Sequence, residues 1–143
     1  MTARYAIYFA PALDSPLWRR AMEWFDQPDL QTLTVSARRY GFHATIKAPM
    51  HLARPYGELA EGLAGFARVH APAALTGLLP RLIGGFLALT CAPQPEAVTD
   101  LAAEVVEAFE PFRLPPSASE IARRLKAPLT ARQVELVERY GYP

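Results

Sequence analysis

Proline stands at short intervals along this chain and limits the length of every helix and strand that it can form. There are 14 prolines among 143 residues, which is about twice the usual share of roughly 5%. Because proline lacks an amide hydrogen and fixes φ, it is expected at the ends of helices and strands and not in their interiors. Most of these prolines do stand between segments with a clear helical or strand pattern. The chain is therefore predicted to fold from many short elements.

The segments between the prolines carry patterns typical of one kind of element or the other. Apolar residues recur at helical spacing in three segments, and Ser15 is placed to cap the first of them. Residues 29–36 are polar without a clear period and are expected to form a loop. Helices are expected from Pro16 to Pro28, from Pro55 to Pro72 and from Pro95 to Pro111, and strands at residues 5–10, 42–52, 73–83 and 86–91.

Turn and capping residues complete this outline. The pair Gly84 and Gly85 predicts a tight hairpin between the last two strands, and Pro80 predicts an edge position or a bulge in the first of them. Residues 117–120 and 130–133 match the capping-box pattern and predict two short helices near the C-terminus. The order of elements predicts a layered α/β or α+β domain, and we adopt α+β as the fold class.

The composition bounds the kind of protein and its partners. With 51% apolar and 20% charged residues, one globular domain over residues 1–143 is expected. A net charge of +1 requires neither nucleic acid nor an anionic membrane as partner.

The longest apolar run, residues 82–92, is about half of the roughly 20 residues that cross a bilayer. Cys91 is the only cysteine and is expected to be a small buried side chain. We therefore expect a cytoplasmic protein.

Residues 42–48 alternate between two kinds of side chain. One face of the predicted strand, with Phe42, Ala44 and Ile46, is expected to be buried against helices. The other presents an imidazole, a hydroxyl and an ammonium from His43, Thr45 and Lys47. Side chains on one face of a strand lie about 7 Å apart, which spans a phosphate group. An imidazole can act as acid or base near neutral pH, and the other two groups can bind phosphoryl oxygens. Arg39 has the same parity and would bring a second cation if the strand began early.

The same residues also suit a purely structural role. His43 would then be a partly exposed strand residue, and Lys47 an edge charge that discourages pairing between sheets. Structural roles also suffice for the other candidates. These are a surface position for His51, a cap or core-edge role for His70, and a solvated surface for the arginines of the C-terminal helices. The sequence has no phosphate loop, dinucleotide fingerprint or metal-ligand spacing, so we expect neither a metal nor another cofactor.

Four segments taken together resemble a known family. They are residues 8–11 (YFAP), 39–49 (RYGFHATIKAP), 84–89 (GGFLAL) and 139–143 (RYGYP). The set resembles a family of proteins assigned to phosphonate metabolism within the two-histidine (2H) phosphoesterase superfamily, alongside RNA 2′,5′ ligase-like proteins and cyclic phosphodiesterases. The segment around His43 is far more specific than the H-x-T triplet alone. The resemblance therefore favours a functional role for His43.

The resemblance implies a bilobal fold in which each lobe gives one H-x-T or H-x-S strand to a central cleft. One histidine would be the general base and the other the general acid, the hydroxyl residues would hold the phosphate, and no metal would take part. The first motif maps onto His43 and Thr45, which we take as the catalytic residues. Lys47, Arg39 and Tyr40 are the candidate substrate-binding residues.

The second motif has no counterpart here, because neither His51 nor His70 is followed two residues later by Thr or Ser. In the family that motif lies downstream of the segment that residues 141–143 resemble. We therefore expect a C-terminally truncated chain with an incomplete second lobe. Because missing strands would leave an unpaired sheet edge, self-association through the strands at residues 73–83 and 86–91 is also expected.

Two functions follow as hypotheses. The first is a metal-independent phosphoesterase, a hydrolase acting on a cyclic phosphate or phosphodiester of a small sugar or nucleotide and linked to phosphonate metabolism, with half of the catalytic pair missing. The alternative is a noncatalytic phosphate-binding or assembly module, which the missing second histidine favours. The sequence leaves open whether His43 is the acid or the base.

Overall fold

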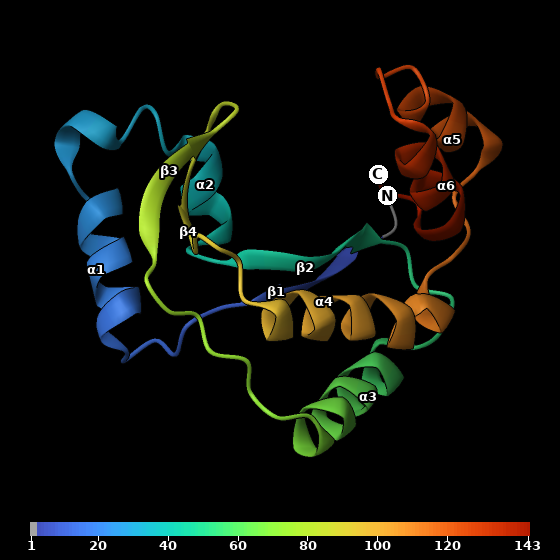
Figure 1. Ribbon diagram of the computed structural model, residues 1–143, viewed down its shortest axis with the longest axis horizontal. Helices are drawn as coiled ribbons and strands as arrows, with labels where there is room; N and C mark the ends of the chain where they lie inside the picture. The colour runs from blue at the N-terminus through green and yellow to red at the C-terminus, as the bar shows by residue number, and fades with distance from the viewer. Residues whose placement is uncertain (1–2) are drawn as a thin grey trace. The chain divides into compact units, whose positions relative to one another are not determined.

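The computed structural model describes residues 3–143 (Figure 1). Its described residues mix short helices with two small sheets, in agreement with the predicted α+β class. They divide into two compact units. The first, which we call the inserted unit, is Ala6–Pro49, and the second, the main unit, consists of residues 3–5 and Met50–Pro143. Each unit is described by itself below.

The inserted unit is built on a pair of strands and two helices. Its elements are β1 (Tyr5–Phe9), α1 (Pro16–Phe25), the 3₁₀ helix η1 (Pro28–Leu30), α2 (Val35–Tyr40) and β2 (Ala44–Met50). The first residue of β1, Tyr5, and the last residue of β2, Met50, belong to the main unit. β1 and β2 are neighbours in one sheet. Ile7 and Phe25 are buried among these elements.

The cap and the proline position predicted for helix α1 are confirmed. The Ser15 hydroxyl accepts a hydrogen bond from the Trp18 amide at 3.1 Å, and Pro16 occupies the first turn, where its missing donor costs nothing. The loop expected at residues 29–36 is only partly correct, because η1 and the start of α2 fall within it. There the buried Thr34 hydroxyl donates to the Leu30 carbonyl at 2.7 Å. The Thr34 amide donates to the same carbonyl at 2.9 Å, so backbone hydrogen bonds form helical turns in a segment with no apolar period.

The main unit holds most of the helices. Its elements are α3 (Tyr56–Val69), β3 (Leu79–Ile83), β4 (Phe86–Thr90), α4 (Glu96–Ala108), the 3₁₀ helix η2 (Glu110–Phe112), α5 (Ala118–Arg124) and α6 (Ala131–Tyr140). The three long helices of the prediction are thus confirmed across both units. The strand expected from residue 73 begins only at Leu79, and a left-handed Gly77 at φ +64° precedes it. Apolar character alone therefore misplaced the start of β3.

An aromatic cluster joins α3, α4 and η2. The rings of Phe66 and Phe109 meet edge to face at 5.7 Å between centroids, and Phe109 lies 5.8 Å from Phe112. Leu59 and Val105 are buried within the same unit. The apolar stripes that predicted α3 and α4 are therefore the ones that build this core.

Gly62 lets α3 approach these rings closely. A β-carbon at this position would lie 3.3 Å from the Phe109 ring and 3.6 Å from the Phe112 ring. We expect Gly62→Leu to lower the free energy of unfolding by about 1–3 kcal/mol, because the added atoms overpack the cluster. Gly57→Leu, in the same helix with nothing within 4 Å, is the matched control and should change it by less than about 0.5 kcal/mol. Urea denaturation of both variants measures the difference, and equal losses would contradict the close approach.

His70 ends α3 and ties it to α4. Its Nδ1 lies 2.7 Å from the Phe66 carbonyl oxygen, its ring stacks on Phe66 at 3.6 Å, and its Nε2 lies 3.3 Å from a Glu104 carboxylate oxygen. These contacts confirm the capping role expected from its place at the end of the helical stripe.

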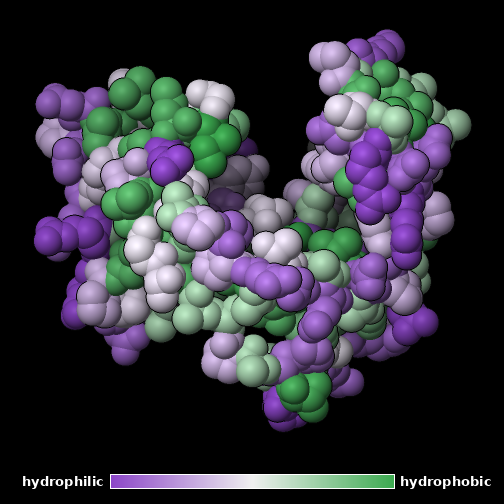
Figure 2. All heavy atoms as spheres, viewed as in Figure 1, coloured by the Kyte–Doolittle hydropathy of each residue, from purple (hydrophilic) through white to green (hydrophobic). Residues whose placement is uncertain are grey.

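Strands β3 and β4 form a separate antiparallel hairpin. Ile83 pairs with Phe86 across the turn, and Gly84 alone of the two turn glycines has a positive φ, at +58°. A positive φ at the first turn position is the type II′ pattern, which confirms the predicted hairpin. Large apolar side chains lie exposed on both strands: Leu79, Leu82, Ile83, Phe86, Leu87 and Leu89. Figure 2 shows this apolar surface over β3 and β4. In the described part of the chain no third strand joins this sheet.

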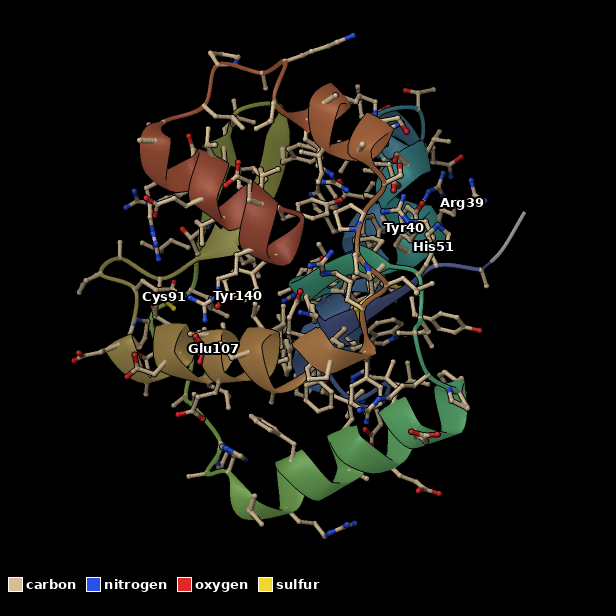
Figure 3. The ribbon with its side chains drawn as sticks, turned by 90° about the vertical axis from the view of Figure 1, so that its right-hand side faces the viewer. Arg39, Tyr40, His51, Cys91, Glu107 and Tyr140 are labelled. Atoms are coloured by element: carbon tan, nitrogen blue, oxygen red, sulfur yellow. The ribbon has the colours of Figure 1, made fainter. Side chains whose placement is uncertain are left out.

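Both predicted capping boxes are confirmed at the C-terminal helices. In α5, the Ser117 hydroxyl accepts from the Glu120 amide at 3.3 Å while a Glu120 carboxylate oxygen accepts from the Ser117 amide at 3.0 Å. In α6, Thr130 and Gln133 make the equivalent pair. α6 is joined to α4 by the Tyr140 hydroxyl, which donates to a Glu107 carboxylate oxygen at 3.3 Å (Figure 3).

The α5 capping box also shifts the pKa of one of its own residues, Glu120. The hydrogen bond from the Ser117 backbone amide, followed by the one from its hydroxyl, lowers the pKa of Glu120. A carboxylate with a lowered pKa stabilises the fold above its ordinary pKa, and the contribution is lost as the pH falls through the lowered value. We expect Ser117→Ala to raise the pKa of Glu120 toward that of an ordinary glutamate, as followed by NMR titration of its carboxyl carbon. Thr130→Ala, which breaks the other box, should leave this pKa unchanged.

Across residues 3–143, none of the helices combines the length and apolar character that a bilayer crossing demands.

Candidate active site around His43

The segment that carries the H-x-T triplet differs from its prediction. β2 begins at Ala44 and not at Phe42, so His43 lies in the loop just before the strand. Exposure along β2 does not alternate, because Ala44 and Thr45 are both exposed while the later residues are buried or half-buried. The expected burial of Ala44 is therefore wrong. Alternation requires one covered and one open face, whereas this strand is open at its start and covered at its end.

Lys47 does not share the exposed setting of Thr45. It is 4% exposed, although its parity placed it beside His43 and Thr45 on one open face. A lysine can bury its long aliphatic stem, and the strand twist rotates successive side chains away from a common direction. Lys47 therefore does not belong to the exposed face that its parity predicted.

His43 is held by a backbone carbonyl and flanked by two tyrosines. Its Nδ1 lies 2.9 Å from the Gly41 carbonyl oxygen. The Tyr8 ring lies 4.2 Å from the imidazole, centroid to centroid, and the Tyr40 ring lies 6.2 Å from it. The imidazole is half-buried. β1, the end of α2 and the loop before β2 therefore each contribute one ring to this cluster.

The carbonyl contact determines which nitrogen can take up a proton. A carbonyl oxygen only accepts hydrogen bonds, so Nδ1 of His43 must donate to Gly41. In the neutral ring the lone pair is then on Nε2. The second nitrogen is therefore the one able to act as a base.

Gly41 makes this geometry possible. Its φ is +73°, a region that side chains with a β-carbon rarely adopt, and it ends α2. A β-carbon here would also lie 3.4 Å from the Trp18 ring. The turn from α2 into the His43 loop therefore depends on glycine.

The remaining candidate residues are placed less closely. Arg39 and Tyr40 are exposed near the end of α2, and Figure 3 shows both on that helix. Tyr40 reaches the imidazole through the ring contact given above, whereas no contact in the described part of the chain joins Arg39 to this cluster. Tyr8, which has the shorter ring contact with His43, was not among the predicted site residues. The segment YFAP was its only sequence signal.

Cys91 lies in a structural setting: its side chain is buried, as predicted. Residues 3–143 contain no group of three His, Cys, Asp or Glu side chains arranged to hold a metal ion.

Fold and site together define an α+β protein with a partly exposed histidine fixed by a carbonyl and flanked by tyrosines. Residues 45–143 match the family described as "Protein of unknown function (DUF1045)". Because this match covers more than half of the sequence, the chain belongs to the DUF1045 family.

Two curated relatives are similar over almost the whole chain. A protein of Janthinobacterium sp. (strain Marseille) is 34% identical over 160 residues, which cover 98% of this chain and 35% of the relative. A protein of Laribacter hongkongensis (strain HLHK9) is 32% identical over 157 residues, which cover 98% of this chain and 36% of the relative. Both are named ribose 1,5-bisphosphate phosphokinase PhnN. The chain spans about a third of the length of these relatives. No solved structure matches it significantly.

Proposed function

We propose that this chain is a phosphoester-handling domain of the two-histidine type that acts on a small phosphorylated sugar or nucleotide in phosphonate metabolism. The observation that carries the proposal is the fixed imidazole of His43, whose Nδ1 donates to the Gly41 carbonyl at 2.9 Å. That bond orients the ring and leaves Nε2 as the proton acceptor. The resemblance of residues 39–49 to the first 2H motif supports the same role.

The proposed reaction is hydrolysis of a cyclic phosphodiester. A water oxygen forms a bond to phosphorus, its proton passes to Nε2 of His43, and one ester P–O bond breaks. The leaving oxygen takes up a proton from solvent, where a complete two-histidine site would use its second histidine. Thr45, exposed two residues after His43, is the proposed hydrogen-bond donor to a phosphoryl oxygen.

The names of the relatives support a substrate class. Both are phosphokinases of a ribose bisphosphate by name, so a ribose phosphate is the sugar that we propose. We do not extend the kinase reaction to this chain, because none of its eight glycines belongs to a G-x-x-x-x-G-K-[ST] phosphate loop. The proposed 2H lobe and the named phosphokinase activity are two chemistries on related phosphorylated compounds.

A noncatalytic phosphate-binding module is the second candidate. It is favoured by the single H-x-T triplet, since neither of the other histidines is followed by Thr or Ser at the second position. Such a module would bind phosphate through Thr45 and His43 without turnover.

Hydrolysis assays separate the two candidates. We would incubate the protein with 2′,3′-cyclic nucleotides and with cyclic phosphates of ribose, each with and without EDTA. Turnover that survives EDTA supports the metal-independent phosphoesterase. Absence of turnover with every compound would exclude that activity for this chain, and phosphate binding measured by NMR would then support the module.

A further inference from the structure

The main unit contains a pocket that the proposed chemistry does not use. Its volume is about 590 Å³, within the range of roughly 300–1,000 Å³ typical of small-molecule sites. Two tyrosines, Tyr5 and Tyr56, line it together with His51, Arg54, Leu114 and Glu120. None of these residues belongs to the inserted unit that holds His43.

The backbone around the pocket is held by hydrogen bonds from distant parts of the sequence. The Leu114 amide donates to the His51 carbonyl at 2.8 Å, and the Ala53 amide donates to the Phe112 carbonyl at 2.9 Å. The His51 imidazole Nδ1 lies 3.2 Å from the Ala3 carbonyl oxygen, to which it donates. These bonds bring three chain segments together at one pocket, so its lining is fixed by the fold.

One part of the lining is aromatic. The rings of Tyr5 and Tyr56 stack at 5.4 Å between centroids, with an interplanar angle of 29°. Tyr56 is also largely exposed, so part of its surface is open to a ligand. Aromatic side chains of this kind bind planar rings by stacking, with little dependence on which ring is bound.

The charged groups decide which planar ligand fits. Ser117 keeps Glu120 ionised through hydrogen bonds to its Oε2, and Oε1 takes no part in those bonds. The Arg54 guanidinium, 5.2 Å from the centre of the Phe112 ring, contributes the opposite charge. A phosphate would be repelled by Glu120, and an ammonium ion would be repelled by Arg54. A neutral ring that both donates and accepts hydrogen bonds meets neither difficulty.

We propose that this pocket binds the base of a nucleoside that carries an exocyclic amino group, with the base against Tyr5 and Tyr56 and its amino group donating to Glu120. Adenine, guanine and cytosine have such a donor, and uracil has none. Arg54 then faces the acceptor atoms of the base. The site uses none of the residues of the proposed phosphoester chemistry and does not depend on it.

NMR titration of the whole chain with adenosine, cytidine and uridine tests this proposal. Unphosphorylated nucleosides isolate the base from any phosphate site. We expect shifts at residues of the pocket and tighter binding of cytidine than of uridine. Tyr56→Ala should weaken binding at least about fivefold, whereas Tyr142→Ala, outside the pocket lining, should not.

A second variant tests the acceptor without disturbing the helix. Glu120→Gln keeps the capping box, because glutamine serves at that position as well, but removes the charge. It should abolish the preference for cytidine over uridine. His43→Ala should leave nucleoside binding unchanged, so failure here and failure of the phosphoesterase proposal are distinguishable. No shifts at millimolar nucleoside, or a stronger response to ribose 5-phosphate at the same residues, would overturn the proposal.

Discussion

Replacing His43 with alanine is expected to lower hydrolysis of a cyclic phosphodiester by about 10²- to 10⁴-fold, the usual contribution of a general acid or base. The imidazole is the group whose Nε2 is left able to accept a proton by the bond to Gly41. The measurement is the initial rate of hydrolysis of a 2′,3′-cyclic nucleotide. Circular dichroism of the variant would confirm that the fold is retained.

His70→Ala is the matched control for this loss. His70 also bonds to a carbonyl through Nδ1, but it lies at the end of α3, and its Nε2 contacts the carboxylate of Glu104 in α4. Its removal should lower stability and leave the hydrolysis rate within a few-fold. Equal losses of rate in both variants would show that stability and not catalysis is being measured.

Gly41→Ala tests the carbonyl that orients His43. The substitution strains a backbone at φ +73° and places a methyl group 3.4 Å from Trp18, so the carbonyl should shift. We expect a loss of rate with the imidazole still present. A Gly41→Ala protein with an unchanged rate would contradict the orienting role.

The protein at micromolar concentration is expected to form dimers through the β3–β4 hairpin. An isolated two-stranded sheet is marginally stable in water, and three or more strands with a buried face are usually needed. Pairing two hairpins supplies four strands and brings together apolar side chains of the pairing strand β4 such as Phe86 and Leu87, which are 78% and 56% exposed. Size-exclusion chromatography with light scattering should therefore report twice the mass of the chain.

The register indicates which edge pairs. Ile83 and Phe86 flank a two-residue turn, and in hairpins of this kind the flanking pair is hydrogen-bonded. The alternation then directs the backbone groups of Pro80 and Leu82 outward on β3, and those of Leu87 and Leu89 outward on β4. Pro80 has no amide hydrogen to offer at its edge. β4 is therefore the edge available to a second copy, related by a twofold axis.

Leu87→Pro tests this edge directly. It removes an outward donor from β4 without removing a bond of the β3–β4 ladder, and it should give a monomer. Leu87→Ala is the control for the lost apolar surface and should retain dimers. A wild-type chain that remains monomeric across the micromolar range would refute self-association through this hairpin.

The elements that could be predicted are those whose signals are local. The cap at Ser15, the capping boxes at residues 117–120 and 130–133 and the glycine turn at residues 84–85 each depend on neighbours in sequence. The start of β3 and the helical turns around Thr34 were missed, since apolar runs do not fix where pairing begins and a few backbone-bonded turns leave no periodic pattern in the sequence.

The candidate site was predictable only in part, for the same reason. His43 and Tyr40 lie three residues apart in sequence, so one segment brings their rings together. Tyr8 reaches His43 from a different strand, and no spacing in the sequence encodes that contact. The burial of Lys47 likewise depends on which residues cover the end of β2. The alternation of side chains along a strand does not reveal those residues.

The division of the chain also imposes an order on its synthesis. Residues 3–5 belong with Met50–Pro143, and the whole of Ala6–Pro49 is made between them. At about 5–20 residues per second, roughly 3–10 s pass between translation of Tyr5 and of its stacking partner Tyr56. All of Ala6–Pro49 is thus synthesised before the ribosome has made that partner. The stack of Tyr5 on Tyr56 can therefore form only after every residue of Ala6–Pro49 has been synthesised.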